Sequence, residues 1–132
     1  YELRLEDIRA TLLENASMVV LNFTLQFIPD KERLRILKRI ASGMLPGGAL
    51  LLAEKVRFDN TFEQNLMTDL HHDFKRYQGY SDLEIAQKRA SLENVLVSNT
   101  ESEHIKRLAS AGFSSQQQCV RCLNFEAFLA IR

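Results

Sequence analysis

Residues 16–55 decide the fold of this chain, because they read strand, loop, helix, turn and strand: ASMVVLNFTLQF (16–27), PDKERLRILKRIASGM (29–44) and LPGGALLLAEK (45–55). The apolar runs Ser17–Phe23 and Ala49–Ala53 are typical of strands buried on both faces, as in parallel sheets. Asp30 suits the N-cap of the helix between them, and Pro46-Gly47-Gly48 suits a turn. This order predicts an α/β fold, the second half of a doubly wound, mostly parallel sheet.

Residues 56–98 are predicted to form a helical insertion. A first helix is expected to end at Gly79, because apolar residues repeat every four positions before it, at Phe62, Leu66, Leu70 and Phe74. This stripe belongs either to the core or to a dimer surface. Ser81 and Glu84 have the spacing of a capping box, which opens a second helix from Asp82 to about Val95.

Residues 99–132 are predicted to hold one more helix and two strands. Thr100 and Glu103 make a second capping box, and Gly112 suits the C-cap of that helix. The strands 115–121 and 124–131 are joined by a very short link, which indicates an antiparallel hairpin. Because no repeat or linker divides the chain, we expect one partial domain over residues 1–132.

The glycine-rich loop that follows the first strand of a doubly wound sheet is absent from this sequence. Residues 1–6 read as the tail of an earlier strand. We therefore expect the chain to be a piece of a longer protein, or to receive its missing half from another copy. The strand at Val19–Leu21 should then expose an apolar edge, and residues 1–10 should be poorly anchored.

Composition excludes several classes of protein. The chain has 17 Lys and Arg against 17 Asp and Glu, so its formal charge is zero, which argues against general attraction to nucleic acid or an anionic membrane. No apolar run approaches the ~18 residues of a membrane-spanning helix, and the charged start YELRLEDIRA is unlike a signal peptide. A cytoplasmic location is expected.

Two short motifs invite a metal or redox site, and neither is expected to form one. Cys119 and Cys122 have the C-x-x-C spacing but no second ligand pair, so two reduced thiols are expected. His71 and His72 are adjacent on a predicted helix, where side chains point about 100° apart and cannot easily chelate one ion. We expect no metal site, and a structural or interface role for the histidine pair.

Six sequence stretches together resemble one family: DIR (7–9), ENASMVVLNFTLQF (14–27), PGGALLLAEK (46–55), HHDFKR (71–76), GYSDLEIAQKR (79–89) and LENV (92–95). They are similar to the C-terminal part of carboxy-S-adenosylmethionine synthases, which are homologues of class I S-adenosylmethionine-dependent methyltransferases. The resemblance covers essentially the whole chain. It implies a Rossmann-like fold whose last strand is antiparallel.

The resemblance also implies an activity. Members of the family use S-adenosylmethionine and prephenate and release carboxy-S-adenosylmethionine and phenylpyruvate. A separate enzyme then uses the product to modify the wobble uridine of tRNA. The resemblance implies a cytoplasmic homodimer with a small-molecule substrate and no direct contact with nucleic acid or membrane. We expect this chain alone to be inactive.

Cofactor-binding residues are implied by the same resemblance. Asp7 corresponds to the carboxylate that accepts a hydrogen bond from the adenine amino group, and the backbone of Ile8 would read the adjacent ring nitrogen. Asn22, near the end of a buried strand, corresponds to a residue close to the sulfonium. The ordinary alternatives are a turn-capping aspartate and an asparagine that bonds neighbouring backbone.

Arg89 corresponds to an arginine that reaches the site from the neighbouring subunit and holds the new carboxylate of the product. A guanidinium suits a carboxylate because it can donate two parallel hydrogen bonds. From the residues alone, Arg89 would be one more charge on a solvated helix face. Two other functions stay open: an ordinary small-molecule methyltransferase, and a non-catalytic interaction module built on residues 56–98. The sequence assigns no catalytic residue.

Overall fold

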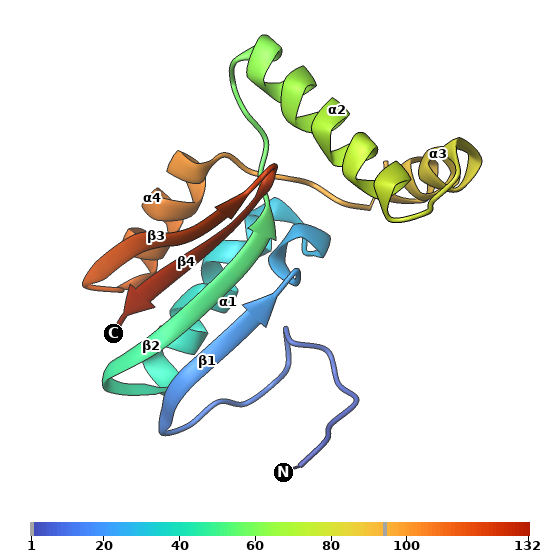
Figure 1. Ribbon diagram of the computed structural model, residues 1–132. Coiled ribbons are helices and arrows are strands. Elements are labelled where there is room, and N and C mark those ends of the chain that lie inside the picture. Colours follow the sequence, from blue (N-terminus) through green and yellow to red (C-terminus); the bar gives the residue numbers. More distant parts are fainter. Residues whose placement is uncertain (1, 94) are drawn as a thin grey trace.

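The computed structural model describes residues 2–93 and 95–132, and a four-stranded sheet organises them (Figure 1). The strands lie in the order β1-β2-β4-β3, with the bounds β1 (Ala16–Asn22), β2 (Met44–Lys55), β3 (Ser115–Cys122) and β4 (Phe125–Ile131). The helices are α1 (Asp30–Gly43), α2 (Thr61–Tyr77), α3 (Asp82–Leu92) and α4 (Glu101–Ala111). A short 3-10 helix, η1 (Leu25–Phe27), follows β1.

The α/β class and the terminal hairpin are confirmed, and the mostly parallel sheet is matched in part. The pair β1–β2 is parallel, with Val20 opposite Leu51. The pairs β2–β4 and β4–β3 are both antiparallel. The reason is that β4 turns back from the hairpin to lie beside β2. Within the described residues no strand pairs with the other edge of β1.

Local sequence signals determine where most of the helices begin and end. The capping boxes at Ser81 and Thr100 are both present, and Gly112 closes α4 with a φ of 102°. The second helix of the insertion, α3, ends at Leu92 and so stops short of Val95. Asp30 is the first residue of α1 and not its N-cap, a position held by Pro29. Its carboxylate instead accepts a hydrogen bond from Arg107 at 2.9 Å.

The predicted Pro-Gly-Gly turn is a bulge within β2. The register against β1 moves from Ala16 opposite Met44 to Met18 opposite Ala49. A side chain at Gly48 would meet the carbonyl oxygen of Leu45 at 2.9 Å, so this close backbone approach requires glycine. The bulge lets β2 begin directly after α1 and still pair with β1 over its second half.

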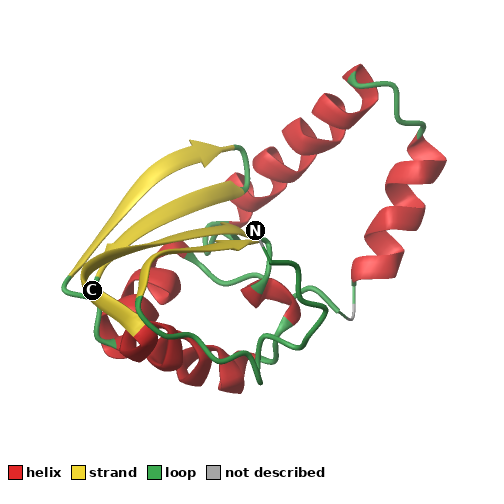
Figure 2. Ribbon diagram, turned by 90° about the horizontal axis from the view of Figure 1, so that it is seen from below, coloured by secondary structure: helices red, strands yellow, loops and turns green. Residues whose placement is uncertain are grey.

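The core lies between one face of the sheet and the helices α1 and α4, which Figure 2 shows beneath the strands. Alternate residues of β2 and β4 point into this layer. The side chains with no exposed surface include Leu37, Leu50, Leu52, Leu108 and Phe128. Each such side chain contributes about 1.5–3 kcal/mol of transfer free energy.

The opposite face of the sheet is open, so the expectation that β1 is buried on both faces is wrong. Met18 and Val20 are 58% and 53% exposed, whereas Leu21, which points at α1, is buried. The expected open edge at Val19–Leu21 is present among the described residues, because β1 is the outermost strand, although the Leu21 side chain is buried. Residues 2–6 form no strand, contrary to the sequence reading, and Leu3 and Leu5 are exposed.

Helices α2 and α3 project beyond the sheet (Figure 1). The stripe Phe62, Leu66, Leu70 and Phe74 is exposed along α2, so it is not part of the core of this chain. Asn60 caps α2 by accepting the backbone N–H of Glu63 at 3.0 Å.

Candidate functional site

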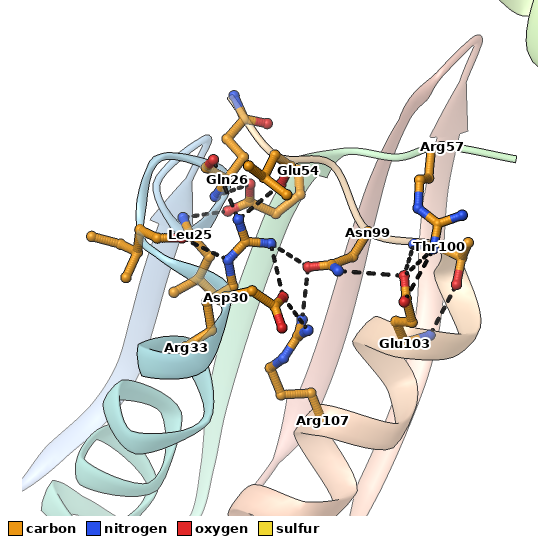
Figure 3. A network of polar contacts seen from close by, with 12 residues as sticks. Leu25, Gln26, Asp30, Arg33, Glu54, Arg57, Asn99, Thr100, Glu103 and Arg107 are labelled. Atoms are coloured by element: carbon orange, nitrogen blue, oxygen red, sulfur yellow. Dashed lines mark hydrogen bonds and ion pairs between the residues drawn. The ribbon is translucent and has the colours of Figure 1, made fainter. Parts of the chain in front are cut away.

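The loop that follows β1 is held from inside by a buried carboxylate on β2. Glu54 accepts backbone N–H groups from Thr24 at 3.1 Å, Leu25 at 2.8 Å and Gln26 at 3.0 Å (Figure 3). Burial raises the pKa of Glu54, and these three hydrogen bonds oppose the rise. The carboxylate therefore fixes η1 directly beyond the tip of β1.

A buried guanidinium ties the same loop to the segment before α4. Arg33 donates to the carbonyl oxygens of Ile28 at 2.9 Å and Val97 at 2.8 Å, and it contacts the side-chain oxygen of Asn99 (Figure 3). Arg107 also donates to that oxygen, at 3.1 Å. Burial lowers the pKa of Arg33. The strand tip thus rests on an internally bonded polar network.

The tip of β1 carries Asn22 and a strained Phe23. Asn22 is exposed and lies opposite Ala53 of β2. Phe23 has a φ of 51°, and its N–H donates to Ala53 at 2.8 Å. A non-glycine residue held in this region costs about 1–3 kcal/mol and is often found at a functional site. The geometry therefore leaves the Asn22 amide at the carboxyl edge of the sheet, where ligands of such sheets bind.

Asp7 and Ile8 lie in the turn before β1. The Arg9 guanidinium donates to the Asp7 carboxylate at 2.6 Å, and its hydrogen bonds lower the pKa of Asp7 to about 2. Ile8 is half-buried and lines a cavity of about 990 Å³ together with Val19 and Leu21. Leu21 faces this cavity, so Asn22, the next residue of β1, points to the opposite face of the sheet and does not line it. Arg9 donates to both oxygens of the Asp7 carboxylate.

Arg89 is exposed on α3, and its positive charge lowers the pKa of Lys55, after burial and Lys75. Lys55 ends β2 two residues beyond Ala53, so it lies on the same face of the sheet as Asn22. Arg89 belongs to α3, which projects beyond the sheet (Figure 1), and its approach to the site from a neighbouring subunit stays a prediction.

Sequence reasoning did not single out Lys55 or Lys75, and it gave His71 only a structural or interface role. Burial and then the positive charge of Lys75 lower the pKa of both Lys55 and His71, and the ring of His71 lies edge-on to Phe125 at 5.0 Å. Two signals could have found them: a lysine at the carboxyl end of a buried strand, and a histidine and lysine four positions apart on one helix face. Phe23, 5.6 Å from Phe125, packs beside them.

Among residues 2–93 and 95–132, no three His, Cys, Asp or Glu side chains gather as a metal site would need. Cys119 and Cys122 are exposed free thiols. None of the described helices has the length and apolar character to cross a membrane.

Curated proteins named carboxy-S-adenosyl-L-methionine synthase match almost the whole chain. The protein from Hahella chejuensis is 56% identical over 131 residues, which is 99% of this chain and 53% of the relative. The one from Geobacter sp. strain M21 is 52% identical over 126 residues, or 96% of this chain and 52% of the relative. This chain is a homologue of those synthases. It spans about half their length, and no protein-family model matches it.

Solved structures confirm the fold of this synthase homologue. Human N-acetylserotonin methyltransferase in complex with SAM aligns with a TM-score of 0.64 at 20% identity, over 98% of this chain and 33% of that one. The pyocyanin biosynthetic protein PhzM aligns with a TM-score of 0.66 at 16% identity, over 96% and 33%. The described residues thus have the architecture of part of a class I methyltransferase fold.

Proposed function

We propose that the chain is the C-terminal part of a carboxy-S-adenosylmethionine synthase. The full-length protein would convert S-adenosylmethionine and prephenate to carboxy-S-adenosylmethionine and phenylpyruvate, for use in tRNA wobble-uridine modification. The observation that carries the proposal is 50–56% identity to the named synthases over at least 96% of the chain. The chain would then be a partial domain, with residues 56–98 as its helical insertion.

Three residues near the tip of β1 would bind the cofactor. Asp7 would accept the adenine amine, the backbone N–H of Ile8 would read the ring, and Asn22 would lie close to the sulfonium. Support comes from the cavity that Ile8 lines and, separately, from the position of Asn22 at the carboxyl end of β1. At neutral pH the Asp7 carboxylate is fully ionised, because its pKa is about 2, so it can act only as an acceptor.

Arg89 would favour the carboxylated product over S-adenosylmethionine. A sulfonium stabilises an adjacent carbanion, so loss of a methyl proton allows a new carbon–carbon bond to the carbon dioxide that prephenate releases. The hydroxide lost as prephenate becomes phenylpyruvate takes up that proton as water, which balances the reaction. The added carboxylate is the group that a guanidinium recognises, and plain S-adenosylmethionine has no charge there.

The homodimer belongs to the same proposal. The exposed stripe on α2 consists of large apolar side chains, with Phe62 77% exposed. A contiguous apolar helix face is typical of a protein–protein contact. We propose that a second copy covers this face, and that the full-length dimer works in the cytoplasm on a small-molecule substrate, without direct nucleic-acid or membrane contact.

Mass spectrometry tests the proposed activity. The full-length protein is incubated with S-adenosylmethionine and prephenate, and the adenosyl product is weighed. An S-adenosylmethionine heavier by one carboxyl group supports the proposal. Chain 1–132 on its own should show weak cofactor binding or none.

An ordinary small-molecule methyltransferase is the second candidate, because the solved structures with this fold include methyltransferases. Transfer of a labelled methyl group to an acceptor, unaffected by Arg89→Ala, would favour it over the synthase.

A further inference from the structure

A cluster of basic side chains lies beyond the ends of β2 and β4. Lys55 is half-buried at the end of β2 and pairs with Phe125, the first residue of β4. His71 and Lys75 are one helical turn apart on α2, so they share a face. The ring of His71 contacts that of Phe125, with centroids 5.0 Å apart. This contact directs the His71–Lys75 face of α2 toward the strand tips.

Among the described residues, no ion pair joins a carboxylate to the amine of Lys55 or Lys75. Glu84 lines a cavity together with Lys75, and two other nearby acids are paired with an arginine. Asp73 and Asp82 both bind Arg76, at 2.7 and 2.8 Å, and Glu84 accepts from Ser81 at 2.8 Å.

Burial and the charge of Lys75 act on two groups of the cluster. Burial, followed by Lys75 and Arg89, lowers the pKa of Lys55. Burial, followed by Lys75 and Lys55, lowers the pKa of His71 to about 4. Half-buried like charges raise the free energy of a site unless an anion neutralises them. At neutral pH the His71 ring is uncharged and can donate one hydrogen bond.

We propose that Lys55, His71 and Lys75 form a carboxylate-binding subsite for the dicarboxylate substrate of the full-length enzyme. This inference rests on the proposed function and identifies substrate-binding residues within this chain. Prephenate carries two carboxylates, of which one departs as carbon dioxide. The subsite holds the carboxylate that phenylpyruvate retains, and Arg89 stays available for the carboxylate added to the cofactor. The methionine carboxylate of S-adenosylmethionine is the rival ligand for the same cations.

Two variants, Lys55→Met and Lys75→Met, test the subsite in the full-length protein. Methionine keeps most of the apolar stem and removes the charge. The KM for prephenate is measured by steady-state kinetics, and the Kd for S-adenosylmethionine by calorimetry. Each variant should raise the KM for prephenate about tenfold or more, the loss expected for one charge-assisted hydrogen bond. The Kd for S-adenosylmethionine should stay within about twofold.

Matched variants keep the test decisive. Lys106→Met, on an exposed part of α4, should leave both constants unchanged, and Lys55→Arg should recover most of the affinity for prephenate. An unchanged KM in both methionine variants, or a parallel loss of affinity for S-adenosylmethionine, would overturn the subsite and leave the synthase proposal standing. Failure of the unmodified protein to use prephenate would instead reject the proposed function.

Discussion

The two faces of the sheet differ sharply, although the same strands form both. On the face covered by α1 and α4, Leu50 has no exposed surface. On the other face, Leu129 is 36% exposed and Val20 is 53% exposed. Strands with apolar residues on both faces are typical of sheets covered on both sides. This chain thus builds one layer of its core by itself, while its open face and strand tips remain available to other groups.

The largest expected effect comes from truncating a leucine on each face. Leu50→Ala should lower the free energy of unfolding of chain 1–132 by about 2–5 kcal/mol, because it leaves a cavity in the core. Leu129→Ala is the matched change on the open face, where solvent already reaches the side chain, and should cost about 1 kcal/mol or less. Urea denaturation measures the free energy of unfolding of both variants. Equal losses would show that the two faces of the sheet do not differ in packing.

Acid should destabilise the covered face through His104. Its ring is buried and stacked 5.3 Å from Phe128, and burial, then Arg107 and Arg33, lower its pKa to about 4. The unfolded chain takes up this proton near pH 6.5. Between pH 6.5 and 4 the unfolded chain therefore binds more protons than the folded chain. Stability that is present above pH 6.5 is lost as the pH falls through about 4.

The size of this acid effect is about 3 kcal/mol for a single histidine shifted this far. His104→Leu should flatten the dependence of the free energy of unfolding on pH between 6.5 and 4. Part of the dependence should remain, because the pKa of His71 is lowered in the same range. If the free energy of unfolding of His104→Leu depends on pH as steeply as that of the unmodified chain, His104 is not held neutral on the covered face.

On the open side, Arg89→Ala should change ligand preference and leave stability intact. In the full-length protein we expect the Kd for carboxy-S-adenosylmethionine to rise about 10- to 100-fold, because a charge-assisted pair with a carboxylate is lost. The Kd for S-adenosylmethionine should hardly change. Calorimetry with both ligands gives the ratio, and equal losses for the two would contradict the role given to Arg89.

The smallest expected effect concerns assembly. Leu66→Ser and Leu70→Ser, both on the exposed stripe of α2, should each weaken the dimer of the full-length protein about tenfold, since truncation of a buried interface side chain costs about 1–2 kcal/mol. Leu12→Ser, at an exposed leucine outside α2, serves as the control. Sedimentation across a concentration series measures the dimer, and an unaltered dissociation constant in both α2 variants would remove the stripe from the interface.

Signals that depend on a few adjacent residues could be predicted from the sequence. The capping boxes at Ser81 and Thr100 and the glycine at the end of α4 are set by local hydrogen bonds and by φ. The family motifs also predicted the methyltransferase-like fold. By contrast, the mostly parallel sheet is matched only in part, because β4 lies antiparallel between β2 and β3, a position that depends on packing between distant parts of the chain.

The same distinction explains what was missed at the candidate site. Lys55 and His71 are 16 positions apart in the sequence, and only the fold brings α2 over Phe125. The buried contact of Arg33 with the Asn99 side chain is equally non-local. The sequence of an amphipathic helix does not reveal which of its lysines and arginines face a ligand and which face solvent.

Identification of the small molecule that the protein retains tests whether the strand tips at Asn22 and Lys55, together with Arg89, bind a carboxylated adenosyl ligand. The full-length protein is purified without added ligand, denatured, and the released small molecule is identified by mass spectrometry. We predict S-adenosylmethionine carrying one extra carboxyl group, lost in the Arg89→Ala variant. Plain S-adenosylmethionine, retained equally by both proteins, would contradict the account.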